Sequence, residues 1–101
     1  MTHYYFPQPV LNSASMAEEC RAEVAALLQS AAPVTLALAT VDRITPSFAN
    51  TFMMQLLDQF GEEYLRQNLI FEPASPWVTE ALARSVKRHR SGIRLSDQRP
   101  A

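Results

Sequence analysis

Apolar side chains form one continuous run along this chain, and in several other segments they recur at regular intervals. Residues 34–40 read VTLALAT, apolar at nearly every position and β-branched at the start. A strand that is covered on both faces has such a run, whereas a strand with one wet face alternates. Pro33 and Pro46 bracket the segment and leave little room for a helix. The run therefore predicts a short buried strand.

The next segment changes to a helical period. Six apolar side chains share one face over residues 47–60: Phe48, Phe52, Met53, Leu56, Leu57 and Phe60. Their spacing predicts an amphipathic helix whose aromatic stripe packs against a sheet. Gly61 either caps this helix or breaks it before residues 62–67 form a further turn.

The N-terminal third predicts a strand and a helix. Residues 2–6 read as a short edge strand, because the prolines that follow are confined to strand ends and edges. Ser15-Met16-Ala17-Glu18 fits a capping box, which predicts a helix over residues 15–29 that ends before Pro33. Its apolar stripe consists of Met16, Cys20, Val24, Leu27 and Leu28.

The C-terminal third predicts a strand over residues 68–72 and then a helix. Ser75 followed by proline at position 76 is typical of a helix start. The helix extends to about residue 90, presents Val78, Leu82 and Val86 on one face, and ends at Ser91-Gly92. The resulting order, β-α-β-α-β-α, predicts a small α/β sandwich with three helices and three or four strands, the central ones parallel.

Length and composition fit one globular domain. The chain has 101 residues, of which 48% are hydrophobic and 19% charged, as in folded domains. We expect the domain to occupy residues 1–90 and residues 91–101 to form a basic, flexible tail. Residues 1–83 carry three basic and nine acidic side chains, whereas residues 84–101 carry six basic and one acidic. Such asymmetry is typical of an interaction tail.

Several signals point to the cytoplasm. The only cysteine, Cys20, has no partner for an intramolecular disulfide. Residues 1–10 lack the basic-then-apolar pattern of a signal peptide. The longest apolar run is far below the ~20 residues that span a bilayer. We therefore expect a cytoplasmic protein without a membrane partner.

Enzyme signatures are mostly missing. The two glycines, Gly61 and Gly92, cannot build a phosphate-binding glycine loop. His3 and His89 lie near opposite ends of the chain, and neither pairs with Cys20 at metal-ligand spacing. We expect no catalytic residue, no metal and no cofactor.

Ser47 is the most interesting polar residue, because it lies at the first turn of a predicted helix just after a strand. A hydroxyl there can cap the helix, bind an anion at the positive helix end or accept a phosphoryl group. Capping is favoured on general grounds. Thr45 can itself be the cap, however, which leaves Ser47 within the first turn.

Other residues are candidates for contact with a partner. Met54 is expected to point away from the apolar stripe, where methionine suits an adaptable contact surface. Trp77 either closes the core or anchors an interface. Arg84, Lys87 and Arg88 share one helix face. Three roles are open for them: a solvated helix end, contact with an acidic partner, or contact with nucleic acid. Nucleic acid is the least favoured of these, because residues 1–83 are acidic.

One segment resembles a known family. Val41-Asp42, followed by Thr45-Pro46-Ser47-Phe48-Ala49-Asn50, is similar to the bacterial STAS-like domain of unknown function, and the resemblance extends over about residues 15–90. That fold resembles anti-sigma factor antagonists, which dock onto ATP-binding serine kinases of the histidine-kinase-like type. The resemblance implies a non-enzymatic regulator that binds such a protein, with Ser47 as a phosphorylation switch.

With this family in view, the expected partner contacts are Asp42, Arg43, Thr45, Asn50, Met54, Trp77, Arg84, Lys87 and Arg88. Two alternatives remain open. One is an accessory protein associated with nucleic acid, or with phage or defence functions, that uses the basic third helix. The other is a structural homodimer formed through an edge strand or the Trp77 face.

Overall fold

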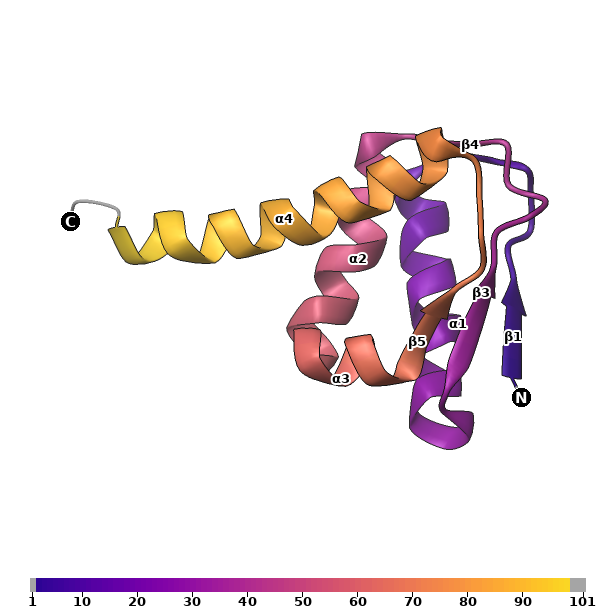
Figure 1. Cartoon of the computed structure of the whole chain (residues 1–101), viewed down its shortest axis with the longest axis horizontal. Helices are drawn as coiled ribbons and strands as arrows, with labels where there is room; N and C mark the ends of the chain where they lie inside the picture. Colours follow the sequence, from indigo (N-terminus) through magenta and orange to yellow (C-terminus); the bar gives the residue numbers. More distant parts are fainter. Residues whose placement is uncertain (1, 99–101) are drawn as a thin grey trace.

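The computed structural model describes the backbone of residues 2–98 and the side chains of residues 2–89 (Figure 1). The elements follow in this order: β1 (Thr2–Tyr5), β2 (Val10–Leu11), α1 (Ala14–Ala31), β3 (Val34–Ala37), β4 (Arg43–Ile44), α2 (Pro46–Phe60), α3 (Glu62–Asn68), β5 (Leu69–Phe71) and α4 (Pro76–Gln98). The expected α/β class is confirmed. Residues 62–67, expected as a further turn, lie in the helix α3, which also includes Asn68, expected as the first residue of the next strand.

Three strands form a parallel sheet in the order β1-β3-β5. Thr2 pairs with Val34, and Val34 pairs with Leu69. A second parallel pair joins β2 to β4, and the sequence pattern did not predict it because two residues are too few to show a period. Thr45 N donates to Leu11 O at 2.9 Å at the end of this pair, which sets where α2 begins.

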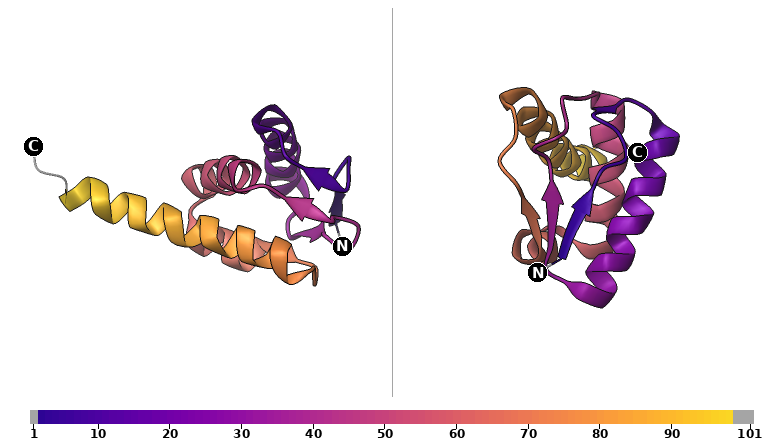
Figure 2. Two further views of the ribbon diagram at one scale, coloured as in Figure 1. Left: turned by 90° about the horizontal axis from the view of Figure 1, so that it is seen from above. Right: turned by 90° about the vertical axis from the view of Figure 1, so that its right-hand side faces the viewer.

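The helices cover one face of the sheet. In the right-hand view of Figure 2 the three strands lie in front of α1 and α2, and no helix of residues 2–98 lies over their other face. Fully buried Phe48 and Phe52 stack with ring centroids 6.0 Å apart, and Phe6 packs against both. The expected aromatic stripe of the second helix is therefore part of the core.

The central strand β3 is buried at all four positions, as expected. The expected reason was wrong in part, because helices do not cover both faces. Side chains alternate between the faces of a strand, so the register places His3, Thr35 and Ile70 on the uncovered face. Tyr5 follows on the same face and is 69% exposed, while Ile70 is 43% exposed. We call His3, Tyr5 and Ile70 the open sheet face.

The helix starts differ from expectation at α1. The side chain of Ser13, not of Ser15, accepts a hydrogen bond from the backbone N of Met16, at 3.2 Å. Ser13 has the extended backbone that a cap requires, and Ser15 is exposed within the first turn. The expected capping box at Ser15 is therefore wrong, because two serines two residues apart offer equivalent local signals. The buried face is shifted accordingly: Ala17 and Ala25 are buried, whereas Met16 and Leu27 are partly exposed.

The last helix is longer than expected. α4 continues through Ser91 and Gly92 to Gln98, because one glycine costs only about 1 kcal/mol relative to alanine within a helix. The expected flexible tail over residues 91–101 thus begins as helical backbone. Its residues 99–101, and all of its side chains, lie outside the described residues. Within residues 2–98, no helix is both long and apolar enough to cross a membrane.

Candidate functional site

The connection between β4 and α2 positions the two hydroxyls of the candidate switch. The side chain of Thr45 accepts a hydrogen bond from Phe48 N at 3.2 Å, and Pro46 occupies the first helical position. Thr45 is therefore the cap. Ser47 is exposed within the first turn, and its hydroxyl forms no hydrogen bond with the side chains and backbone that the structure describes.

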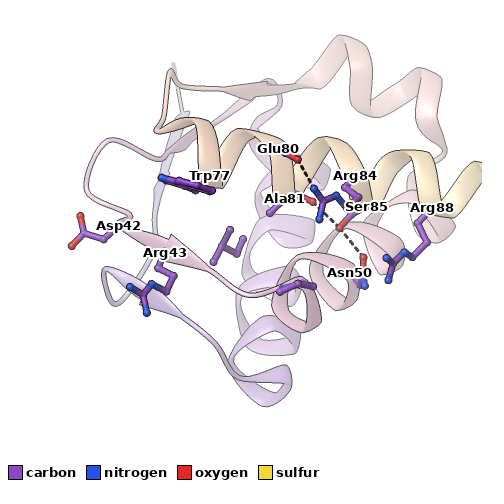
Figure 3. A pocket seen from close by; sticks show the side chains of 11 residues that line it. Asp42, Arg43, Asn50, Trp77, Glu80, Ala81, Arg84, Ser85 and Arg88 are labelled. Atoms are coloured by element: carbon purple, nitrogen blue, oxygen red, sulfur yellow. Dashed lines mark hydrogen bonds and ion pairs between the residues drawn. The ribbon is translucent and has the colours of Figure 1, made fainter.

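A pocket of about 570 Å³ lies beside this connection, between β4 and the start of α2 on one side and α4 on the other (Figure 3). Its lining residues are Asp42, Arg43, Ile44, Pro46, Asn50, Trp77, Glu80, Ala81, Arg84, Ser85 and Arg88. The volume lies within the range of small ligand sites.

One end of the pocket is apolar. The pocket lining includes the buried side chain of Ile44 on β4, and Figure 3 shows Trp77 at one end of the pocket, at the start of α4. Trp77 is 79% exposed, so it does not close the core, which was one of its two expected roles. A large aromatic side chain left in water beside a pocket is typical of interface anchors.

The other end is polar and holds two helices together. Ser85 of α4 is buried, and its hydroxyl donates to Asn50 Oδ1 of α2 at 2.9 Å and lies 3.1 Å from Ala81 O. Arg84 forms an ion pair with Glu80 one turn earlier on the same helix. Figure 3 shows Arg88 reaching down from α4 toward the end of the pocket where Asn50 lies.

The pocket brings together six of the expected partner contacts. They come from β4 and the residue before it, from α2 and from α4: Asp42, Arg43, Asn50, Trp77, Arg84 and Arg88. Four other expected residues, Thr45, Ser47, Met54 and Lys87, do not line it. Met54 is half-buried rather than free at the surface. Sequence reasoning missed Ser85, although a serine within an otherwise apolar helix face is a signal that a buried polar partner is near.

Chemically reactive groups elsewhere are few. Cys20 and Tyr4 meet between α1 and β1, where Tyr4 Oη donates to Glu23 Oε1 at 2.6 Å. Burial, followed by hydrogen bonds with Cys20 and Glu23, raises the pKa of Tyr4. Burial also raises the pKa of the Cys20 thiol, which keeps it protonated and unreactive. Among the described residues, no three His, Cys, Asp or Glu side chains come together as a metal site.

A family model matches more than half of the chain. The model is described as a STAS-like domain of unknown function and covers residues 17–79, from within α1 to the first turn of α4. No curated protein and no solved structure gives a significant match. The matched segment contains the β4–α2 connection and the apolar end of the pocket.

Proposed function

The chain belongs to the family of STAS-like domains of unknown function, and on this premise we propose that it is a non-enzymatic cytoplasmic regulator that binds another protein. Ser47 is the switch of this interaction. The partner is an ATP-binding serine kinase of the histidine-kinase-like type, which phosphorylates Ser47 and is then released.

The observation that carries this proposal is the division of roles between Thr45 and Ser47. Because Thr45 supplies the cap, a phosphoryl group on Ser47 leaves the helix start intact. The phosphoryl group adds nearly two negative charges at the N-terminus of α2. The positive end of the helix dipole stabilises these charges. The exposed Ser47 hydroxyl is accessible to a kinase, and adding two charges to a contact surface disfavours a complex formed with the neutral serine.

The test uses charge substitution at two equivalent serines. Ser47 and Ser15 are both exposed, and each occupies the second helical position of its helix. Affinity capture from the native host, followed by mass spectrometry, compares the wild type with Ser47→Asp and with the matched control Ser15→Asp. We expect an ATP-binding kinase in the wild-type and Ser15→Asp captures, absent with Ser47→Asp, and phosphate at Ser47 in protein isolated from the host. Retention of every captured protein by Ser47→Asp would contradict the switch.

A second candidate function is structural homodimerisation. Parallel sheets are almost always covered on both faces, yet no helix lies over the open sheet face in Figure 2. A second copy would cover this face with the same apolar and aromatic side chains that it exposes, as in an interface with twofold symmetry.

A further inference from the structure

We propose that the pocket between β4, α2 and α4 binds an acidic segment of the partner protein that carries an apolar side chain. The apolar side chain lies against Trp77, and a carboxylate binds Arg88 and Asn50. This inference rests on the proposed function, because it names the chemistry of the partner that the regulator binds.

The apolar end of the pocket supplies the anchor. The pocket lining includes the apolar side chains of Ile44 and Ala81, and Trp77, which lies at one end of the pocket in Figure 3, is 79% exposed. Removing apolar surface from water stabilises a complex by roughly 25 cal/mol per Å². An apolar side chain that covers the exposed indole of Trp77 therefore favours binding. A leucine or phenylalanine side chain matches the apolar chemistry of this end.

The polar end selects the charge of the occupant. Arg84 is already paired with Glu80, but Arg88 forms no ion pair or hydrogen bond with any described side chain. Asn50 Oδ1 accepts from Ser85, and no described group accepts a hydrogen bond from the amide nitrogen of Asn50. A guanidinium and an amide nitrogen at one end of a pocket complement a carboxylate.

The acidic residues of the pocket do not cancel this preference. Glu80 is neutralised by Arg84, and the carboxylate of Asp42 points away from Arg84 and Arg88 in Figure 3. A nucleic acid is a poorer occupant, because residues 1–83 carry nine acidic and only three basic side chains and repel a phosphate backbone. The polar end therefore fits one or two carboxylates rather than a polyanion.

The experiment uses a built-in reporter. Trp77 is the only tryptophan of the chain, so its fluorescence reports directly on the pocket. The probe is a tryptophan-free peptide with two carboxylates and blocked termini, Gly-Leu-Phe-Glu-Glu-Gly, and its counterpart carries lysine in place of both glutamates. We expect the acidic peptide to shift the emission of Trp77 to shorter wavelength with a saturable dependence that weakens with salt. The lysine peptide should produce no saturable shift.

Charge reversal at neighbouring positions of α4 locates the interaction. Arg88→Glu should weaken binding about 10-fold or more, since a charge-assisted hydrogen bond contributes at least the roughly 1.4 kcal/mol that a factor of ten represents. Lys87→Glu makes the same charge change on the same helix outside the pocket, and should weaken binding less than about threefold. Equal effects of the two variants, equal binding of the lysine peptide, or no saturable shift at low salt would each overturn the proposal.

The captured partner separates this proposal from the proposed function. If Ser47→Asp releases the kinase and Arg88→Glu does not, the switch stands and the pocket is not the contact. If the acidic peptide binds as expected but Ser47→Asp retains every protein, the pocket preference stands and the switch is wrong.

Discussion

At the start of α2, the hydroxyl that satisfies a free backbone amide belongs to Thr45, and the exposed hydroxyl belongs to Ser47. The start of α1 repeats this arrangement, with Ser13 as the cap and Ser15 exposed. In both helices the cap is the residue whose backbone is still extended, because only that geometry aims the side-chain oxygen at the amides of the first turn.

The cap assignment predicts unequal effects of removing the two hydroxyls. Thr45→Ala should lower the free energy of unfolding by about 1 kcal/mol, the usual contribution of a cap. Ser47→Ala should change it by less than about 0.5 kcal/mol, as for other surface substitutions. Urea denaturation of the two variants measures both values, and Ser13→Ala with Ser15→Ala provides the same comparison at α1. A larger loss for Ser47→Ala than for Thr45→Ala would show that the cap is misassigned.

The titration of Tyr4 is coupled to folding, because its pKa is raised in the folded protein. Its hydroxyl is held against Glu23, and its raised pKa is caused mainly by burial. In the unfolded chain a tyrosine ionises near its ordinary value of 10.0. Above that pH the folded state therefore holds a proton that the unfolded state has lost, so stability decreases as pH rises.

We expect the alkaline loss of stability to be smaller in Tyr4→Phe. Each ionisation of this kind removes up to about 1.4 kcal/mol per pH unit above the unfolded pKa. The variant keeps the contribution of Cys20, whose pKa is also raised. Urea denaturation between about pH 9 and about pH 11 measures the two slopes. Parallel slopes for wild type and variant would show that Tyr4 ionises freely in the folded protein.

Among the elements, α4 depends on α2 for its position. The apolar contacts of Val78 and Leu82 hold its first half on the core. The Ser85–Asn50 hydrogen bond and the 2.8 Å contact between His89 and Asp58 extend the attachment along α2. This attachment sets the width of the pocket, because β4 and the start of α2 form one wall and α4 forms the other.

Removing either partner of the Ser85–Asn50 hydrogen bond should destabilise the protein. We expect Ser85→Ala and Asn50→Ala each to lower the free energy of unfolding by about 1 kcal/mol, and the double variant to lose less than their sum. A double-mutant cycle in urea measures the coupling, with Ser30→Ala as control, because Ser30 bonds only within an exposed part of α1. Strict additivity would show that the two side chains do not interact in solution.

On the scale of the whole molecule, helices and sheet form two layers, and α4 extends away from them (Figure 1). A three-stranded parallel sheet with helices on one face leaves its other face to solvent or to a partner. His3 and Tyr5 stack on this face with ring centroids 6.2 Å apart, so β1 presents aromatic surface there, and Ile70 lies on the other side of Thr35.

Self-association through the open sheet face makes a prediction for solution size. Wild type should sediment as a dimer at high concentration, whereas Tyr5→Lys and Ile70→Lys should remain monomeric, because a buried, unpaired charge is costly. Gln29→Lys, an exposed position on α1, serves as the control. Analytical ultracentrifugation measures the distribution, and a monomeric wild type at all concentrations would remove the homodimer as a function.

The elements of this protein follow from its sequence because each depends on neighbours along the chain. The continuous run at residues 34–40 marked β3, and the four-residue spacing of the aromatics marked α2. Local patterns failed where two signals were equivalent, as at Ser13 and Ser15, or where an element was as short as β2 and β4.

The pocket was decided by the tertiary structure alone. Its walls join residues 42–50 to residues 77–88, and they meet only because the apolar face of α4 packs on α2. The candidate partner contacts were predicted from separate segments, and their convergence cannot be read from spacing along the chain. The place of Ser85 on the apolar face of α4 signals a buried polar partner, but it does not identify Asn50 as that partner. Likewise, whether a sheet face is covered depends on where helices pack. The sequence of a strand indicates only that its side chains are buried, not which element buries them. For β3, the flanking strands β1 and β5 contribute part of this burial.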